Sequence, residues 1–185
     1  MYSHIDLPES SAERQDPFQV RGFEPFLNGR WIGEAVSYGC YRSGQAPGVR
    51  GPSVAEIEED LKILFSHWNL IRLYGSDADS ERILELIRKH RLPLKVMLGV
   101  WLENETGNPE RREENMAQAM KGIRLANEYA EQIAAVCVGN ETQVTWSAHK
   151  MNRQDLIRYI RLVRNNTNVP VATADDYSFW NTSGS

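Results

Sequence analysis

Two side chains that can do chemistry, Asn140 and Glu141, directly follow a short apolar run in the segment AAVCVGNETQV. A carboxyl group that is partly buried between apolar walls has a raised pKa and can serve as a general acid. The adjacent amide offers a hydrogen-bond donor and an acceptor that could fix a substrate hydroxyl or the carboxyl itself. The structural alternative is that Glu141 caps the loop or helix that follows, and position alone does not separate the two readings.

Five short apolar runs, alternating with amphipathic segments, are the elements that must position these residues. They are EAVSYG (34–39), LIRLYG (70–75), LKVMLGVW (94–101), AAVCVG (134–139) and VPVATA (169–174). Their branched residues, and the Gly, Pro or polar residues that bound them, are typical of buried parallel strands. Strict alternation of strands and helices predicts right-handed crossovers, and so an α/β fold: an open doubly wound sheet or part of a (β/α)8 barrel.

Four helices are predicted between the strands. Ser53 and Glu56 have the spacing of a capping box at the start of the first helix. The second helix must end before Pro93, and Met116 begins an apolar stripe along the third. Asn152 is expected to cap the fourth helix, which carries arginines on its solvated side.

The carboxyl ends of the strands are where both parallel architectures build their sites. Aromatic, acidic, amide and other polar side chains follow the five predicted strands, in order: Tyr38, Tyr41, Arg42, Tyr74, Ser76, Asp77, Trp101, Glu103, Glu105, Asn140, Glu141, Gln143, Trp146, Asp175, Asp176, Tyr177, Phe179 and Trp180. Aromatic faces with carboxylates and amides between them suit a saccharide, which has apolar C–H faces and a rim of hydroxyls. Acidic residues alone could instead hold a divalent cation.

Charge and hydropathy argue against several partners. The chain has 21 Lys and Arg against 25 Asp and Glu, and this net charge of −4 gives no reason to expect nucleic acid or an anionic membrane. No apolar run approaches the roughly 20 residues of a membrane helix. The amino-terminal segment lacks the basic start and apolar middle of a signal peptide, so a cytoplasmic location is the default expectation.

No cofactor is expected from the sequence. The loop YGCYRSGQAPG after the first predicted strand has the wrong glycine spacing for a dinucleotide or P-loop phosphate site. Cys40 and Cys137 lie in apolar runs, so we expect buried free thiols rather than a disulfide or a metal pair.

The segments EAVSYG, IRLYGSD, KVMLGVW, AVCVGNE and VATADDYSFW resemble, in order and spacing, the strand-end motifs of glycoside hydrolase family 17. This is the family of β-1,3-glucanases and glucanosyltransferases, and the resemblance is greatest to its bacterial members. It covers residues from about Trp31 to Trp180, and its most specific element is VGNE.

The resemblance implies a (β/α)8 TIM barrel and a retaining glycosidase that acts on β-1,3-glucan. Glu141 would be the general acid/base, and Asn140 would hold the sugar 2-hydroxyl. Tyr38 and Tyr74 would line the glucan cleft, and Arg72 would support the carboxylates. Asp175 and Tyr177 are further substrate-binding candidates. Gly75 stands where many relatives carry Asp.

The resemblance also implies that the chain holds only part of such a barrel. Residues 1–30 contain three prolines and no sustained period, so we expect an irregular segment followed by a partial catalytic domain over 31–185, with about five βα units. The family's nucleophile Glu, on the seventh strand, would lie beyond Ser185, and the chain alone would then be inactive. An open sheet edge would favour self-association.

Two other functions remain open at this point. One is a non-catalytic β-glucan-binding fragment that works through its aromatic edge. The other is a metal-dependent barrel lyase with Glu141, Asp175 and Asp176 as ligands, although no Lys or His base stands at the strand ends.

Overall fold

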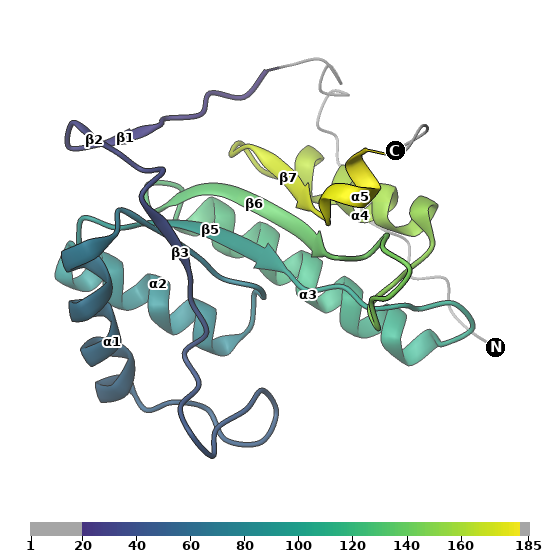
Figure 1. Ribbon diagram of the computed structural model, residues 1–185, viewed down its shortest axis with the longest axis horizontal. Coiled ribbons are helices and arrows are strands. Elements are labelled where there is room, and N and C mark those ends of the chain that lie inside the picture. The colour runs from purple at the N-terminus through teal and green to yellow at the C-terminus, as the bar shows by residue number, and fades with distance from the viewer. Residues whose placement is uncertain (1–19, 182–185) are drawn as a thin grey trace.

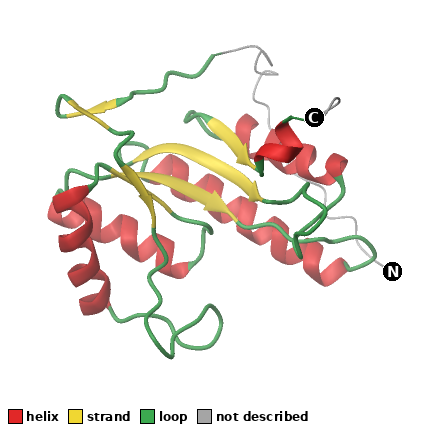
Figure 2. Cartoon of the chain, viewed as in Figure 1, coloured by secondary structure: helices red, strands yellow, loops and turns green. Residues whose placement is uncertain are grey.

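A computed structural model describes residues 20–181 and contains a five-stranded parallel sheet covered by helices (Figures 1 and 2). The strands, in both chain and sheet order, are β3 (Ala35–Ser37), β4 (Leu70–Arg72), β5 (Lys95–Val100), β6 (Ile133–Asn140) and β7 (Val171–Ala174). All neighbouring pairs are parallel, so the five predicted strands are confirmed.

The sheet order distinguishes the two predicted architectures. A doubly wound sheet reverses its strand order at a switch point, whereas a barrel wall adds each strand next to the previous one. The order β3-β4-β5-β6-β7 has no reversal. It therefore agrees with the wall of a (β/α)8 barrel, although β3 and β7 are the two edges of this sheet and closure is not shown within residues 20–181.

Each crossover between strands contains one helix. The helices are α1 (Val54–His67), α2 (Ala78–His90), α3 (Pro109–Glu128), α4 (Arg153–Asn165) and the short α5 (Tyr177–Trp180) after β7. The predicted capping box is confirmed, since the Glu56 amide donates to Ser53 Oγ (3.3 Å) and the Ser53 amide donates to Glu56 Oε2 (2.7 Å). Asn152 caps α4 as expected, its Oδ1 accepting from the Gln154 amide (2.8 Å).

The main core lies between the sheet and the helices. Val96, Leu98 and Val100 point to this side of β5 and are 0–1% exposed, as the period of two along a strand requires. Met97 points to the opposite face, where it packs against a smaller cluster that includes Leu70. Side chains that follow β4 and β5 on this opposite face therefore lie on the same side of the sheet and can come close to one another.

A short antiparallel hairpin precedes the sheet, with β1 (Phe26–Leu27) paired to β2 (Arg30–Trp31). Leu27 and Ile32 pack into the smaller cluster on the face opposite the helices. The hairpin, which extends to Trp31, departs from the irregular segment expected over residues 1–30, and residues 1–19 lie outside the described part. None of the helices within residues 20–181 is long and apolar enough to cross a membrane.

Candidate active site

The turn after β6 presents Asn140 and Glu141 at the carboxyl edge of the sheet. Gly139 has φ +77° and Glu141 has φ +52°, so two left-handed residues flank Asn140. The Glu141 amide donates to the Ala174 carbonyl at the end of β7 (2.9 Å), which holds the turn against the neighbouring strand. A non-glycine residue in this left-handed conformation is uncommon and costly.

Arg72 orients the Asn140 amide. Arg72 Nη2 donates to Asn140 Oδ1 (2.8 Å), and the guanidinium lies over the Tyr74 ring, with its carbon 5.0 Å from the ring centroid. Because a guanidinium has no acceptor, the amide oxygen must face Arg72 and the Asn140 NH₂ group is directed elsewhere. The structure thus brings together Arg72, Tyr74 and Asn140, three of the predicted site residues.

Glu141 is half-buried. None of the side-chain hydrogen bonds or ion pairs within residues 20–181 involves this carboxyl group. Its neighbour Asp175 is committed differently: its Oδ2 accepts from the Gln143 amide (2.9 Å) and its Oδ1 from the Asp176 amide (3.2 Å). Asp175 therefore stabilises the turn beside Glu141.

The other predicted residues after β7 are less enclosed. Tyr177 is 82% exposed at the start of α5. Asp176 caps this helix: its Oδ1 accepts from the Ser178 hydroxyl and from the Ser178 amide (2.6 Å), and these hydrogen bonds lower the pKa of its carboxyl. Among the described residues, no group of three or more His, Cys, Asp or Glu side chains is arranged to hold a metal ion. The arrangement gives the metal-dependent alternative no support.

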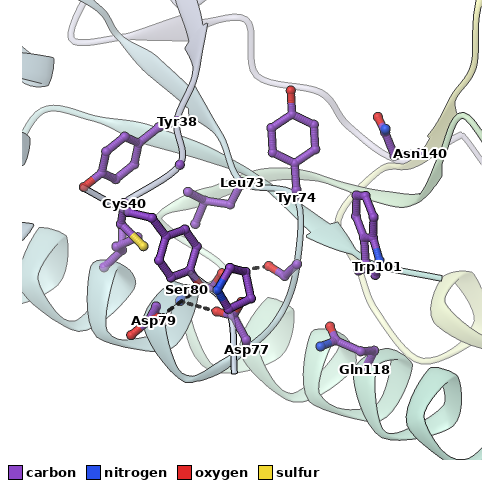
Figure 3. Close-up of a pocket in the computed structure, with 15 residues that line it drawn as sticks. Tyr38, Cys40, Leu73, Tyr74, Asp77, Asp79, Ser80, Trp101, Gln118 and Asn140 are labelled. Carbon is purple, nitrogen blue, oxygen red and sulfur yellow. Dashed lines mark hydrogen bonds between the residues drawn. The ribbon is translucent and has the colours of Figure 1, made fainter. Parts of the chain in front are cut away.

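A cavity of about 470 Å³ opens at the carboxyl ends of β3 to β6 (Figure 3). Its lining is mostly apolar and aromatic, with two carboxylates and a hydroxyl on one wall. The main contributors are Tyr38, Cys40, Tyr41, Leu73, Tyr74, Asp77, Asp79, Ser80, Trp101 and Asn140. Its size and its few polar groups are typical of a small-ligand site.

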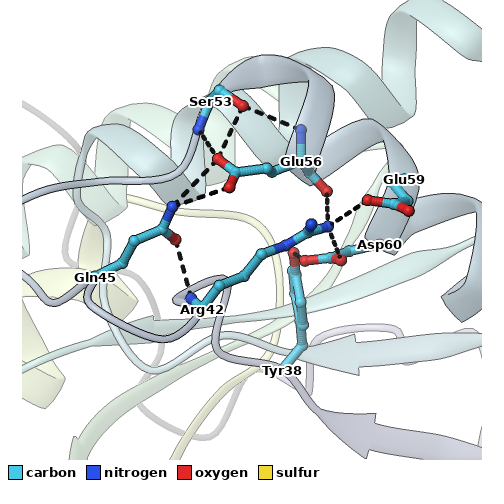
Figure 4. A network of polar contacts seen from close by, with 7 residues as sticks. All are labelled: Tyr38, Arg42, Gln45, Ser53, Glu56, Glu59 and Asp60. Carbon is cyan, nitrogen blue, oxygen red and sulfur yellow. Dashed lines mark hydrogen bonds and ion pairs between the residues drawn. The ribbon is translucent and has the colours of Figure 1, made fainter.

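Tyr38 lines this cavity, but its hydroxyl is tied to α1 (Figure 4). The Tyr38 hydroxyl donates to Asp60 Oδ2 (2.8 Å), and Arg42 Nη2 donates to Asp60 Oδ1 (2.8 Å) and Glu59 Oε2 (2.8 Å). Burial, and then the Asp60 carboxylate, raise the pKa of Tyr38. Tyr38 thus fixes the loop that walls the cavity, and the structure does not bring its hydroxyl to Asn140.

A buried polar network holds the loop after β5. Glu105 Oε2 accepts from the Tyr159 hydroxyl (2.7 Å) and from Asn115 Nδ2 (2.9 Å), and Glu105 Oε1 accepts from Arg158 Nη2 (2.5 Å). Burial by itself raises the pKa of the Glu105 carboxyl, but these three hydrogen bonds outweigh it and the net pKa is lowered. Burial and Glu105 raise the pKa of Tyr159 to about 12. Glu105 is therefore a structural residue of this edge.

Sequence reasoning missed two residues near the cavity, Gln118 and His149. Gln118 on α3 accepts through its Oε1 from the Ser76 amide (3.0 Å), and His149 lies against the Trp101 ring at a centroid distance of 4.5 Å. Gln118 lies within a helix, and His149 lies nine residues beyond the end of β6. A polar residue on the inward-facing side of α3 could have indicated Gln118 from the sequence. Nothing in the sequence of the loop after Glu141 indicated His149.

The close approach of β4 and β5 also determines how side chains are arranged at the carboxyl edge of the sheet. A Cβ at Gly99 would lie 2.2 Å from the Tyr74 carbonyl carbon and oxygen, so only glycine lets the two strands come this near. The same approach sets Tyr74 beside Trp101, with ring centroids 6.5 Å apart at 78°.

Comparison with solved structures gives likenesses of fold. An endo-laminarinase from Formosa matches with a TM-score of 0.65 at 22% identity, covering 81% of this chain and 43% of that one. A β-glucuronidase from Parabacteroides merdae matches with a TM-score of 0.52 at 16% identity, covering 83% and 20%. At these identities the likeness concerns the arrangement of strands and helices alone.

Curated proteins of fungi are similar in sequence. The btgC protein of Aspergillus niger is 33% identical over 138 residues, which is 70% of this chain and 20% of its own. The glucan endo-1,3-beta-glucosidase btgC of Emericella nidulans is 29% identical over 137 residues, with the same coverage. The chain thus spans about one fifth of the curated relatives it matches.

A family model describes the largest part of the chain. The model of the BtgE/BtgC glycoside hydrolase domain matches residues 35–185, which begin with β3 and include every strand of the parallel sheet. This agrees with the glycoside hydrolase character that the VGNE segment indicated. The chain therefore belongs to the family of BtgE/BtgC glycoside hydrolase domains.

Proposed function

We propose that the protein cleaves β-1,3-glucan with retention of configuration, by hydrolysis or by transfer to another sugar, with Glu141 as general acid/base. Relatives named glucan endo-1,3-beta-glucosidase support this substrate. One observation carries the proposal: Arg72 sets the orientation of the Asn140 amide, which directly precedes Glu141 in the turn after β6. The whole protein's activity is part of the proposal, since the relatives are much longer.

Each of these groups has a task in the retaining mechanism. Glu141 protonates the glycosidic oxygen as the bond to the leaving sugar breaks, and later removes a proton from water or an acceptor sugar. The NH₂ group of Asn140 donates to the 2-hydroxyl of the sugar, an interaction that strengthens in the transition state. Tyr74 lines the cavity, and the proposal assigns further substrate contacts to Asp175 and Tyr177 after the neighbouring strand.

A second carboxylate completes this mechanism. Retaining glycosidases place it about 5 Å from the acid/base, where it forms a covalent glycosyl intermediate. Arg72 Nε is buried and has no hydrogen-bond partner within the described residues, so it offers a donor to such a group. The family 17 resemblance assigns this second carboxylate to a Glu at the end of the seventh strand of a complete barrel. The sequential order of β3 to β7 agrees with the first five strands of such a barrel.

The test is hydrolysis of laminarin by the full-length protein and its Glu141→Gln variant. Loss of the acid/base should lower kcat about 100-fold or more, while binding of laminari-oligosaccharides persists. Glu113→Gln, on an exposed position of α3, is the matched control and should keep full activity. Binding without Glu141-dependent hydrolysis would instead support a glucan-binding role.

A second measurement addresses the stereochemistry. In a Glu141→Ala variant acting on an aryl β-glucoside with a good leaving group, azide should restore turnover and give a β-glucosyl azide, because a small anion can attack the glycosyl intermediate without a general base. An α-configured product would exclude the retaining mechanism.

A further inference from the structure

Trp101, on the cavity edge, is held by side chains from two directions. It follows β5 on the same face as Tyr74, and Figure 3 shows it between Tyr74 and Gln118 at the rim of the cavity. Its indole is half-buried, so part of the ring is open to a ligand. Such a ring can stack on the apolar face of a sugar, which makes its orientation important.

Two side chains hold this indole. Glu103 Oε1 accepts a hydrogen bond from Trp101 Nε1 (3.2 Å). The His149 ring meets the indole edge to face, with centroids 4.5 Å apart at 73°, and His149 Nδ1 lies 4.0 Å from the same Glu103 oxygen. The indole therefore has a polar contact at its nitrogen and a packing contact against one side.

Glu103 is itself fixed from two directions. Its backbone amide donates to Asn115 Oδ1 (3.0 Å), and Asn115 Nδ2 donates to the Glu103 carbonyl (2.8 Å), with Asn115 only 2% exposed. On its side chain, Glu103 Oε2 pairs with Arg111 Nη1 (3.1 Å). The acceptor that meets the indole is thus in place before any ligand arrives, which lowers the cost of ordering the site on binding.

Stability alone is a weak reason for this arrangement. A solvent-accessible ion pair such as Glu103–Arg111 contributes little to stability, and Arg111 has a second partner in Glu114 (2.7 Å). The contact that distinguishes Glu103 from Glu114 is the one to the indole nitrogen. Both carboxylates pair with Arg111, and Glu103 also accepts from the indole, as expected of a residue that positions Trp101.

We propose that Glu103 and His149 are positioning residues that hold the Trp101 indole beside Tyr74, so that it stacks on a glucosyl unit of the bound chain. The inference rests on the proposed β-glucan substrate. It adds a binding contact outside the pair formed by Asn140 and Glu141, and two residues that act through it.

The experiment compares Glu103→Leu with Glu114→Leu in the full-length protein, by calorimetric titration of laminarihexaose in a Glu141→Gln background, where the ligand is not cleaved, and by steady-state kinetics with Glu141 intact. Glu103→Leu should weaken binding and raise KM about five- to tenfold, a loss that corresponds to about 1–1.4 kcal/mol, with kcat unchanged. Glu114→Leu removes the same charge from Arg111 and should bind like the wild type. His149→Leu should weaken binding in the same direction.

A double-mutant cycle shows whether the effect passes through Trp101. In a Trp101→Ala background, adding Glu103→Leu should cause no further loss, because there is no indole left to position. Glu103→Gln keeps an oxygen acceptor and should retain wild-type binding, which also guards against a folding defect in the Leu variant. An equal loss in both backgrounds, or equal behaviour of Glu103→Leu and Glu114→Leu, overturns the inference.

These results are separable from the proposed function. If Glu141→Gln abolishes hydrolysis but the Glu103 cycle shows no coupling, the positioning role fails and the catalytic proposal stands. If the wild type binds no laminarihexaose, the positioning role fails as well, and the hydrolysis assay decides the catalytic proposal by itself.

Discussion

Arg72 and Asn140 are 68 positions apart in the sequence, yet Arg72 Nη2 donates to Asn140 Oδ1 at 2.8 Å. The contact joins the end of β4 to the end of β6 across β5, which lies between them in the sheet. It orients the amide next to Glu141 and directs its NH₂ group away from Arg72. A cation on one strand thus sets the orientation of an amide on another.

Removing this cation should impair catalysis more than folding. In Arg72→Met the Asn140 amide is free to rotate, and misplacement of a group that contacts the reacting sugar costs about 100-fold in kcat/KM. The measurement is kcat/KM for laminarin, with Arg161→Met on an exposed position of α4 as the control. Unchanged kcat/KM in Arg72→Met would show that Asn140 does not need this contact.

The left-handed turn at Gly139 should be sensitive to a side chain. A Cβ there would meet Leu156 Cδ1 at 3.0 Å and Thr142 Cγ2 at 3.1 Å, in addition to the cost of φ +77°. We expect Gly139→Ala to lower the free energy of unfolding by about 1–3 kcal/mol, measured by urea denaturation. Gly107→Ala is the control, since Gly107 has φ +70° but nothing within 4 Å of the added Cβ, and it should lose less. Equal losses would mean that packing at Gly139 contributes nothing.

Glu105 should make stability depend on pH in the acid range. Its pKa is lowered in the folded protein, so its ionised form stabilises the fold above the unfolded pKa of about 4.3, and this contribution is lost as pH falls through the folded pKa. The difference in unfolding free energy between wild type and Glu105→Gln should therefore be largest near neutral pH and shrink below about pH 4.3. Urea denaturation across pH 3–7 measures it.

A partial version of the same change provides the control. Tyr159→Phe removes one donor to Glu105 and keeps the ring in the core, where Tyr159 is 0% exposed. It should reduce the pH dependence without abolishing it. A constant difference between wild type and Glu105→Gln at all pH values would show that Glu105 does not contribute through its charge.

The two cysteines should resist thiol reagents. Both are free and buried, as the sequence predicted, and burial, with Asp79 and Asp77 adding to it, raises the pKa of Cys40 to about 11. Because the thiolate is the reactive form, iodoacetamide at pH 8 should label neither Cys40 nor Cys137 in the native protein. Mass spectrometry before and after unfolding in urea measures this. Native labelling of Cys40 at the unfolded rate would show that the cavity admits reagent to the thiol.

The family resemblance, and the carboxylate it singled out, came from short segments at strand ends. VGNE and the four other motifs occur in the order of β3 to β7, and the family model that matches residues 35–185 confirms a glycoside hydrolase. The particular role of each residue remains a prediction until the variants are measured.

The sequence by itself determined the elements and their order. Branched apolar runs, helical periods and caps such as Ser53 and Asn152 depend on residues within a few positions of one another, so the five strands and four main helices were predictable. Their alternation also predicted a parallel sheet.

Only the tertiary structure decided which way the strand-end residues face and what they contact. The pairing of β6 with β7 shifts register between Cys137 and Asn140, and no period of two predicts such a shift. This register shift directly precedes the turn that carries Glu141. Tyr38 meets Asp60 on α1, and Glu105 meets Tyr159 on α4, because sheet order and helix packing bring distant residues together. Local sequence patterns thus indicate which residues are candidates for a site, and long-range packing determines which residues they contact.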